Sequence, residues 1–175
     1  MAWRKELQNN KPFVNAILSG LLYFLFFWSW DFSEAMKTFS PLMFVLPGIT
    51  FPFTTCNYEN IEAKHPVAIM MVHLSLSLAI YFGAVWLYSA EGRIDYISIL
   101  AGFLGSLLFM LLTKYLLNKE IALQHIILVA IISGLAFIPQ TINRQSVILL
   151  GVAVFIWTVS NGFLLNDVQH KDVRS

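Results

Sequence analysis

Three ionisable side chains lie inside stretches of the chain that are otherwise apolar: His73, Lys114 and His125. Ionisable groups are costly within a membrane, and they often mark sites for protons, ions or substrates. An imidazole titrates near neutral pH, so each histidine is a candidate general base or a candidate lining residue of a binding cavity. Lys114 lies near the end of its stretch, where its ammonium group can extend to a headgroup layer.

Polar residues at helical spacing surround the first histidine. His73, Ser77 and Tyr81 stand four residues apart, which places them on one face of a helix. This face can line a cavity that a polar substrate or protons enter; alternatively, each side chain bonds to a neighbouring helix. At a rise of about 1.5 Å per residue, His125 and Asn161 are expected at the depth of His73, so a shared polar cluster is predicted there.

Catalysis and metal binding find little support in the residue pattern. The apolar stretches contain no aspartate or glutamate, and the single cysteine, Cys56, excludes an internal disulfide and any cysteine-pair motif. Two histidines at one depth are the minimum for bis-histidine haem. Zinc needs further ligands, and no carboxylate or cysteine lies at that depth. We therefore expect no catalytic residue, no metal and no cofactor.

The overall composition indicates the solvent in which the chain folds. Of its 175 residues, 58% are hydrophobic and 12% are charged, whereas soluble domains have roughly 25% charged residues. No basic run of the kind that follows a nucleic-acid backbone is present. We therefore predict an all-α integral membrane protein, a polytopic bundle in which residues 1–175 form a single transmembrane domain, with the lipid bilayer as partner and no nucleic acid.

Six stretches are long and apolar enough for transmembrane helices, which need roughly 17–25 residues. They are residues 12–30, 39–56, 67–88, 96–117, 121–139 and 146–165. Lysine and arginine favour the cytoplasmic side of a membrane, and a cytoplasmic N-terminus leaves only Lys37, Arg93 and Arg144 outside. This distribution predicts that both termini are cytoplasmic and that the chain is integral to a plasma membrane, of the bacterial inner-membrane type.

The second stretch, 39–56, contains Pro41, Pro47 and Pro52. Each internal proline removes a helical hydrogen bond, so we predict a kinked or broken helix. A re-entrant pair of half-helices would leave five full crossings, and the distribution of lysine and arginine favours six. Broken helices near the midplane bind ions and substrates in transporters, so Pro47 and Gly48 are also candidate lining residues. The alternative is a kink that only accommodates packing.

Small residues four apart allow helices to approach each other closely in lipid. Ser98, Gly102 and Ser106 form such a row on the stretch 96–117, with Gly105 beside it. We therefore expect this helix to be central in the bundle. The row packs against other helices of the chain, or it serves self-association or contact with other membrane subunits.

Three classes of function remain. The first is transport, as a small-molecule-binding or permeation subunit with its ligand near His73, Ser77, Tyr81 and the second stretch. The second is a non-catalytic membrane subunit of a larger complex, or an immunity or regulatory factor. The third is a membrane enzyme that acts on lipid or quinone with a histidine as base. In length and number of spans, the chain is similar to the substrate-binding subunits of energy-coupling-factor vitamin transporters.

Overall fold

The computed structural model describes residues 11–30, 40–56, 58, 65–89, 96–143 and 146–172, with backbone alone for 40–44 and 167–172. No strand occurs among these residues. The helices are α2 (Lys11–Trp30), α4 (Ser40–Thr55), α5 (Pro66–Ser89), α6 (Ile97–Leu116), α7 (Leu123–Leu135), α8 (Ile138–Ile142) and α9 (Val147–Asp172). The prediction of an all-α protein is confirmed for the described part of the chain.

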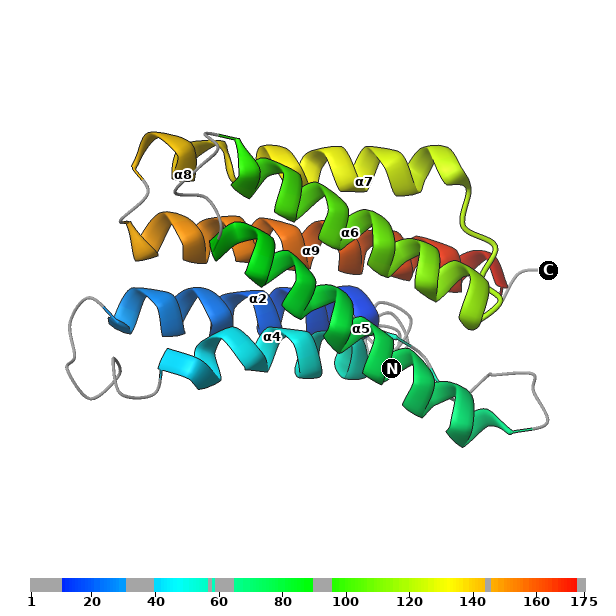
Figure 1. Ribbon diagram of the computed structural model, residues 1–175. Coiled ribbons are helices and arrows are strands. Elements are labelled where there is room, and N and C mark those ends of the chain that lie inside the picture. Colours follow the sequence, from blue (N-terminus) through cyan, green and yellow to red (C-terminus); the bar gives the residue numbers. More distant parts are fainter. Residues whose placement is uncertain are drawn as a thin grey trace, which may run out of the picture.

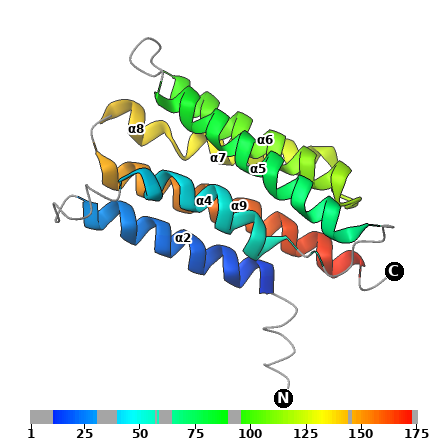
Figure 2. The same ribbon diagram turned by 60° about the horizontal axis from the view of Figure 1, so that its bottom comes forward.

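The long helices form a bundle in which each packs against its neighbours in the chain (Figures 1 and 2). The main contacts are between α2 and α4, α4 and α5, α5 and α6, α6 and α7, and α7 and α9, and α9 closes the ring against α2. Successive helices run in opposite directions, so the start of α2 and the end of α9 lie at the same end of the bundle. We call this the terminal end and the opposite one the distal end.

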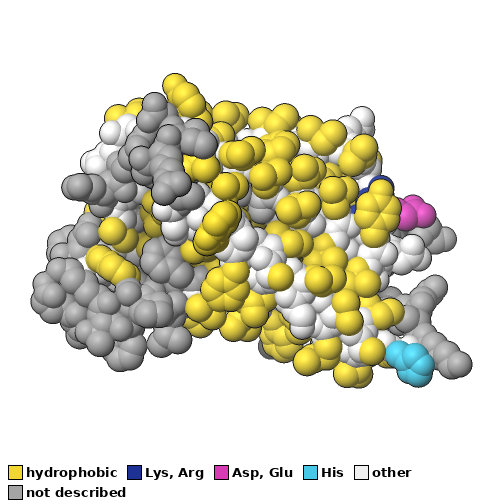
Figure 3. All heavy atoms as spheres, viewed as in Figure 1, with side chains coloured by type: hydrophobic (Ala, Val, Ile, Leu, Met, Phe, Trp, Pro, Cys, Tyr) yellow, Lys and Arg dark blue, Asp and Glu magenta, His cyan; other side chains and the backbone are white. Residues whose placement is uncertain are grey.

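Five helical segments are long and apolar enough to cross a membrane: α2, α5, α6, α7 together with α8, and α9. The face of the bundle drawn in Figure 3 is largely apolar, and the described charged and histidine side chains visible in that view gather at one end. Large side chains such as Leu18, Trp86 and Leu128 are exposed along the helices. Because such a surface is stable only against lipid, the chain is a helical membrane protein.

The helix α4 has 16 residues and lies beside α2 and α5. It continues as one helix through Pro47 and Pro52. Hydroxyl groups of the helix itself add hydrogen bonds near the prolines: Thr50 donates to the Leu46 carbonyl at 2.8 Å, and Thr54 donates to the Thr50 carbonyl at 2.8 Å. A sixth crossing by α4, and a kink in it, stay predictions.

The predicted fifth span, 121–139, differs from the helices observed. The helix α7 ends at Leu135, a turn follows at Ala136 and Phe137, and the short helix α8 begins at Ile138. Pro139 is the physical reason, because it has no N–H to continue the helix and clashes with the preceding turn. The bend brings Phe137 inward, where it is buried against α6.

Close approach of α2 to α9 depends on small residues at their contact. A β-carbon placed on Gly20 would lie 2.9 Å from Cδ2 of Phe155, and one on Gly151 would lie 2.9 Å from Cβ of Phe27. Ala16, one turn before Gly20, is fully buried. A β-carbon at either glycine would therefore require the facing phenylalanine to shift.

The predicted small-residue row of α6 is buried within the chain. Ser98 and Ser106 are inaccessible to solvent, and Gly102 packs against Phe137 and the carbonyl of Ser133. The expectation that this helix is central is confirmed, since α6 has the largest buried share of the five spanning segments. Association with other subunits stays a prediction, and it would need residues other than these three.

Candidate functional site

His73 is completely buried, and both of its ring nitrogens are hydrogen-bonded. The hydroxyl of Tyr58, which lies between α4 and α5, is 2.8 Å from Nδ1. Oγ1 of Thr113 on α6 is 3.0 Å from Nε2. The imidazole thus connects three separate parts of the chain at the terminal half of the bundle.

The surrounding contacts favour one proton arrangement for His73. Thr113 donates its own proton to the Phe109 carbonyl at 2.9 Å, so its oxygen is left to accept from Nε2–H. The Tyr58 hydroxyl is 3.3 Å from the Pro52 carbonyl and 2.8 Å from Nδ1. The shorter contact is the one in which Nδ1 accepts its proton. Burial, with a smaller contribution from the neighbouring Cys56, raises the pKa of the Tyr58 phenol above its ordinary value, so this group keeps its proton. In this arrangement the imidazole is neutral and has no unused nitrogen.

Asn161 forms a second buried polar junction, on α9. Ser106 of α6 donates to its Oδ1 at 2.8 Å. Its Nδ2 donates to Oγ of Ser133 on α7 at 3.2 Å, and to the Trp157 carbonyl at 2.7 Å. Both amide protons are therefore used, and the side chain joins three helices.

The expected polar cluster at the depth of His73 is not formed. The ammonium group of Lys114 donates to the Ile121 carbonyl and so closes the turn between α6 and α7, where Asn118 has a positive φ of 50°. His125 lies on the outer surface, in an apolar groove between α7 and α9. His73 and Asn161 have the separate partners given above, so equal depth did not bring these residues together.

A cavity of about 70 Å³ lies at the centre of the bundle. Pro47 and Gly48 of α4 and Ser77 and Tyr81 of α5 line it together, and these are candidates that the transport hypothesis expected around one ligand. The remaining walls come from α2, α6, α9 and the turn before α8. With Phe51 of α4, the apolar lining includes Phe27, Ala101, Gly105, Phe109, Phe137, Leu150, Val154 and Trp157. The walls are therefore largely aromatic and aliphatic.

Ser77 is a buried polar residue in the largely apolar cavity wall. The side chain is 3% exposed, and its Oγ has no hydrogen-bond partner among the described residues. A buried hydroxyl without a partner costs roughly 1–3 kcal/mol. A second polar group is the carbonyl of Gly48, since Pro52 lacks the N–H that would bond to it in a regular helix. Tyr81 and Tyr88 also bring hydroxyl groups to this largely apolar, partly open cavity, and that of Tyr88 accepts a hydrogen bond from Gln140.

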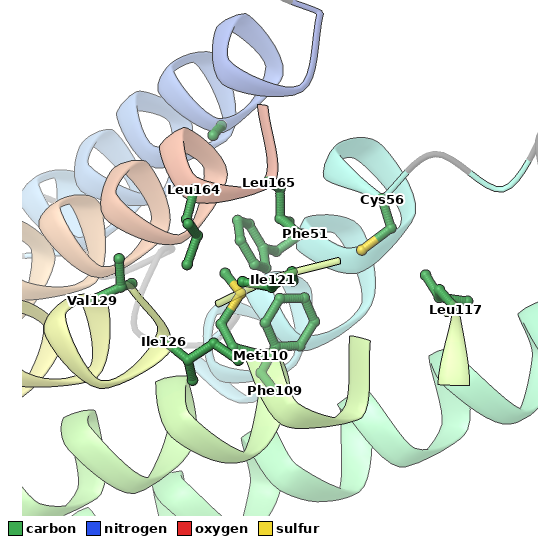
Figure 4. Packing of buried hydrophobic residues seen from close by; sticks show 11 residues of the cluster. Phe51, Cys56, Phe109, Met110, Leu117, Ile121, Ile126, Val129, Leu164 and Leu165 are labelled. Carbon is green, nitrogen blue, oxygen red and sulfur yellow. The ribbon is translucent and has the colours of Figure 1, made fainter. Parts of the chain in front are cut away.

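Aromatic side chains close the cavity on the side of the terminal end. The rings of Phe51 and Phe109 have centroids 5.2 Å apart, and Figure 4 shows them in the core beside Met110 and Ile121. Trp157 packs against Phe51 at 5.0 Å. Beyond them lies the His73 junction, so the cavity and the histidine are separated by an apolar layer.

At the distal side, α5 is tied to α8 over the cavity. Nε2 of Gln140 donates to the Tyr88 hydroxyl at 3.0 Å and to the Ser146 carbonyl at 3.2 Å. The ring of Tyr88 lies 6.4 Å from that of Phe137. Both rings line the cavity, so they form its boundary on this side.

Sequence reasoning missed a polar ladder between α2 and α4. Tyr23 is hydrogen-bonded to Thr50, and the hydroxyls of Ser19 and Thr54 are 3.4 Å apart. Asn15 donates to the Thr54 carbonyl at 2.8 Å. The spacing of four residues between Asn15, Ser19 and Tyr23 was a usable signal for this contact face.

The structure also contains a larger groove on its outer surface. It has a volume of about 550 Å³ and follows α9 between α2 and α7. Its walls are apolar apart from His125 and Ser160. Phe163 is 59% exposed there and packs edge-on against Phe13, with centroids 5.6 Å apart.

The arrangement can bind a ligand more readily than it can catalyse a reaction. No group of three histidine, cysteine, aspartate or glutamate side chains suited to a metal occurs among the residues described. Four predicted candidates, Pro47, Gly48, Ser77 and Tyr81, meet at the central cavity. Comparison with protein-family models, with curated proteins and with solved structures finds no match to this chain.

Proposed function

We propose that this chain is a polytopic membrane protein that binds or conducts a small molecule in its central cavity, as a binding or permeation subunit of a transport system. The observation that carries the proposal is Ser77, a buried hydroxyl without a partner on the wall of a cavity within the spanning helices. The neighbouring Pro47–Gly48 pair supports it, because Pro52 leaves the Gly48 carbonyl without its regular helical partner, and freed backbone carbonyls beside a cavity are a recurrent feature of transporter sites.

For the topology, we propose six crossings, with α4 as the sixth spanning helix and both termini in the cytoplasm. The alternating direction of the helices supports an even number. At about 1.5 Å per residue, the 16 residues of α4 cover most of the hydrocarbon layer. The distribution of lysine and arginine supports the orientation, and a bacterial inner membrane is the proposed location.

The test compares solute permeability in proteoliposomes by stopped-flow light scattering. The panel consists of small neutral solutes: formamide, urea, ethylene glycol and glycerol. Ala101→Phe fills the cavity, since Ala101 is 3% exposed and lines it. Leu100→Phe is the matched control, because Leu100 is the adjacent residue and is 46% exposed toward lipid. We expect the wild type and the control to conduct at least one solute that Ala101→Phe does not.

A second candidate function is a non-catalytic membrane subunit, or an immunity or regulatory factor. The observation that favours it is the apolar groove along α9, which could receive a helix of another protein. Native mass spectrometry of gently extracted protein separates the two candidates, since foreign subunits in fixed stoichiometry would support this one. An enzyme acting on lipid or quinone stays the third hypothesis. Its candidate bases are His73, whose two ring nitrogens are both hydrogen-bonded, and His125, which lines the outer groove.

A further inference from the structure

We propose that the ligand of the central cavity is a neutral molecule that places three or four non-hydrogen atoms in it and carries a hydrogen-bonding group there, such as a short alcohol or amide. The inference rests on the proposed function and names the chemical class of its ligand. Three properties of the cavity lead to it: its size, the absence of charge among its described lining residues, and the position of Ser77.

The volume limits the size of the ligand. The cavity measures about 70 Å³, whereas an engineered protein cavity that binds benzene measures roughly 150 Å³. A cavity of half that volume holds about half as many atoms, and benzene has six carbons. The part of the ligand that the cavity holds therefore has three or four non-hydrogen atoms.

The lining residues limit the charge of the ligand. Among the described residues that line the cavity, none is an aspartate, glutamate, lysine, arginine or histidine. An ion without a paired charge is strongly disfavoured in such an environment. His73, the nearest ionisable candidate along α5, is behind the layer formed by Phe51 and Phe109. The bound molecule is therefore neutral.

Ser77 supplies the polar contact. A serine hydroxyl can donate one hydrogen bond and accept others, and here it has no partner among the described residues. A ligand with one hydroxyl or amide group satisfies it, and the rest of the ligand then lies against aromatic walls such as Phe27 and Phe137. A purely apolar ligand of the same size would leave the hydroxyl unsatisfied.

The size of the ligand also limits its affinity. At the highest binding energy per non-hydrogen atom that small ligands reach, a ligand of four such atoms has a Kd no lower than about 40 µM. A ligand held this weakly leaves quickly. The cavity is therefore suited to conducting an abundant small solute and not to capturing a scarce one.

The experiment measures binding of a series of straight-chain alcohols, from methanol to 1-hexanol, to the protein in lipid nanodiscs by saturation-transfer NMR. Xenon, followed by its own NMR shift, is the apolar probe. The variants are Ser77→Ala, with Ser75→Ala as the matched control, since Ser75 is exposed on the same helix. Ala101→Phe gives the background from alcohol that partitions into lipid.

We expect affinity to rise up to 1-propanol and to fall for longer alcohols. Ser77→Ala should weaken propanol binding about threefold to tenfold, as the loss of one hydrogen bond implies, and should leave xenon binding unchanged. Binding of 1-hexanol as tight as that of propanol, or an unchanged propanol affinity in Ser77→Ala, would overturn the ligand class. If xenon still binds in that case, the cavity remains a binding site and the proposed function stands. Equal signals from the wild type and Ala101→Phe with every probe would overturn the ligand class and the proposed function together.

Discussion

Gly48 of α4 lies directly against the ring of Tyr81 on α5: a β-carbon at Gly48 would be 2.5 Å from Cδ1 of Tyr81. Both residues line the central cavity, so this contact fixes one wall of the cavity and the separation of the two helices. Pro47 and Pro52 leave α4 with fewer backbone hydrogen bonds on either side of the contact. The helix is therefore most easily deformed where it meets the cavity.

Gly48→Ala tests this contact. The added methyl group displaces Tyr81, and overpacking of this kind costs about 1–3 kcal/mol of stability. Gly83→Ala is the control, because a β-carbon there would have no neighbour within 4 Å and a helical alanine is favoured over glycine. Unfolding in mixed micelles should show a loss for Gly48→Ala and no loss for Gly83→Ala. Equal stability of the two variants would contradict the packing of α4 on α5.

Tyr58 and His73 should be coupled in stability. Hydrogen bonds between membrane helices contribute on average about 0.6 kcal/mol, with a maximum near 1.7. A double-mutant cycle of Tyr58→Phe and His73→Gln isolates the pair, and a coupling energy in that range is expected. A cycle of Tyr58→Phe with Ser75→Ala, which is exposed on the same helix, should show none. Additive losses in the first cycle would rule out the bond to Nδ1.

Asn161→Leu should destabilise the bundle by about 1–3 kcal/mol, because it leaves Ser106 and Ser133 buried with fewer partners. Ser160→Ala is a mild comparison, since its hydroxyl bonds within its own helix and meets Ser133 only at 3.3 Å. Thermal unfolding in nanodiscs measures both. A loss for Ser160→Ala as large as that for Asn161→Leu would show that the junction does not depend on the amide.

Solute permeability should be independent of pH between 5.5 and 8. The groups that titrate in this range are histidines and unusually placed carboxyl or amine groups, and no described lining residue is of these types. His73 is excluded from the cavity by the aromatic layer. Stopped-flow permeation rates measured at several pH values test this prediction. A marked change in the permeation rate near neutral pH would contradict it, because it would mean that a histidine controls solute permeation.

The number of crossings can be tested by labelling single cysteines in a Cys56→Ala background with a membrane-impermeant maleimide. Lys11 is the first residue of α2, and His65 directly precedes α5; both side chains are exposed. If α4 crosses the membrane, Lys11→Cys and His65→Cys lie on the same side and neither reacts in intact cells, whereas Ser89→Cys at the distal end reacts. Labelling of His65→Cys but not of Lys11→Cys would mean that α4 does not cross the membrane, and the number of crossings would then be five.

Much of the fold was accessible from the sequence, because charges end each apolar stretch and helix boundaries follow the charges. The helix α6, Ile97–Leu116, lies within the predicted range 96–117. The bend at Ala136 was missed although Pro139 signals it. Helical periodicity also identified the face of α5 that carries Ser77 and Tyr81.

Pairing between helices was the part that the sequence did not reveal. Tyr58 lies outside any helix, so no periodicity marks it as the partner of His73. Ser106 and Asn161 are 55 residues apart in the chain, and residue type alone predicts only that each needs some partner. The same limit applies to the cavity, since Gly48 and Tyr81 meet only because α4 packs on α5.

The most direct test is a crystal structure of the protein soaked in 2-bromoethanol, a molecule of four non-hydrogen atoms whose bromine is located by anomalous scattering. The account predicts a bromine peak inside the central cavity, with the hydroxyl of the ligand within hydrogen-bond distance of Oγ of Ser77. Bromine only in the outer groove along α9, or a cavity that stays closed to the ligand, would contradict the claim that this cavity is the binding site.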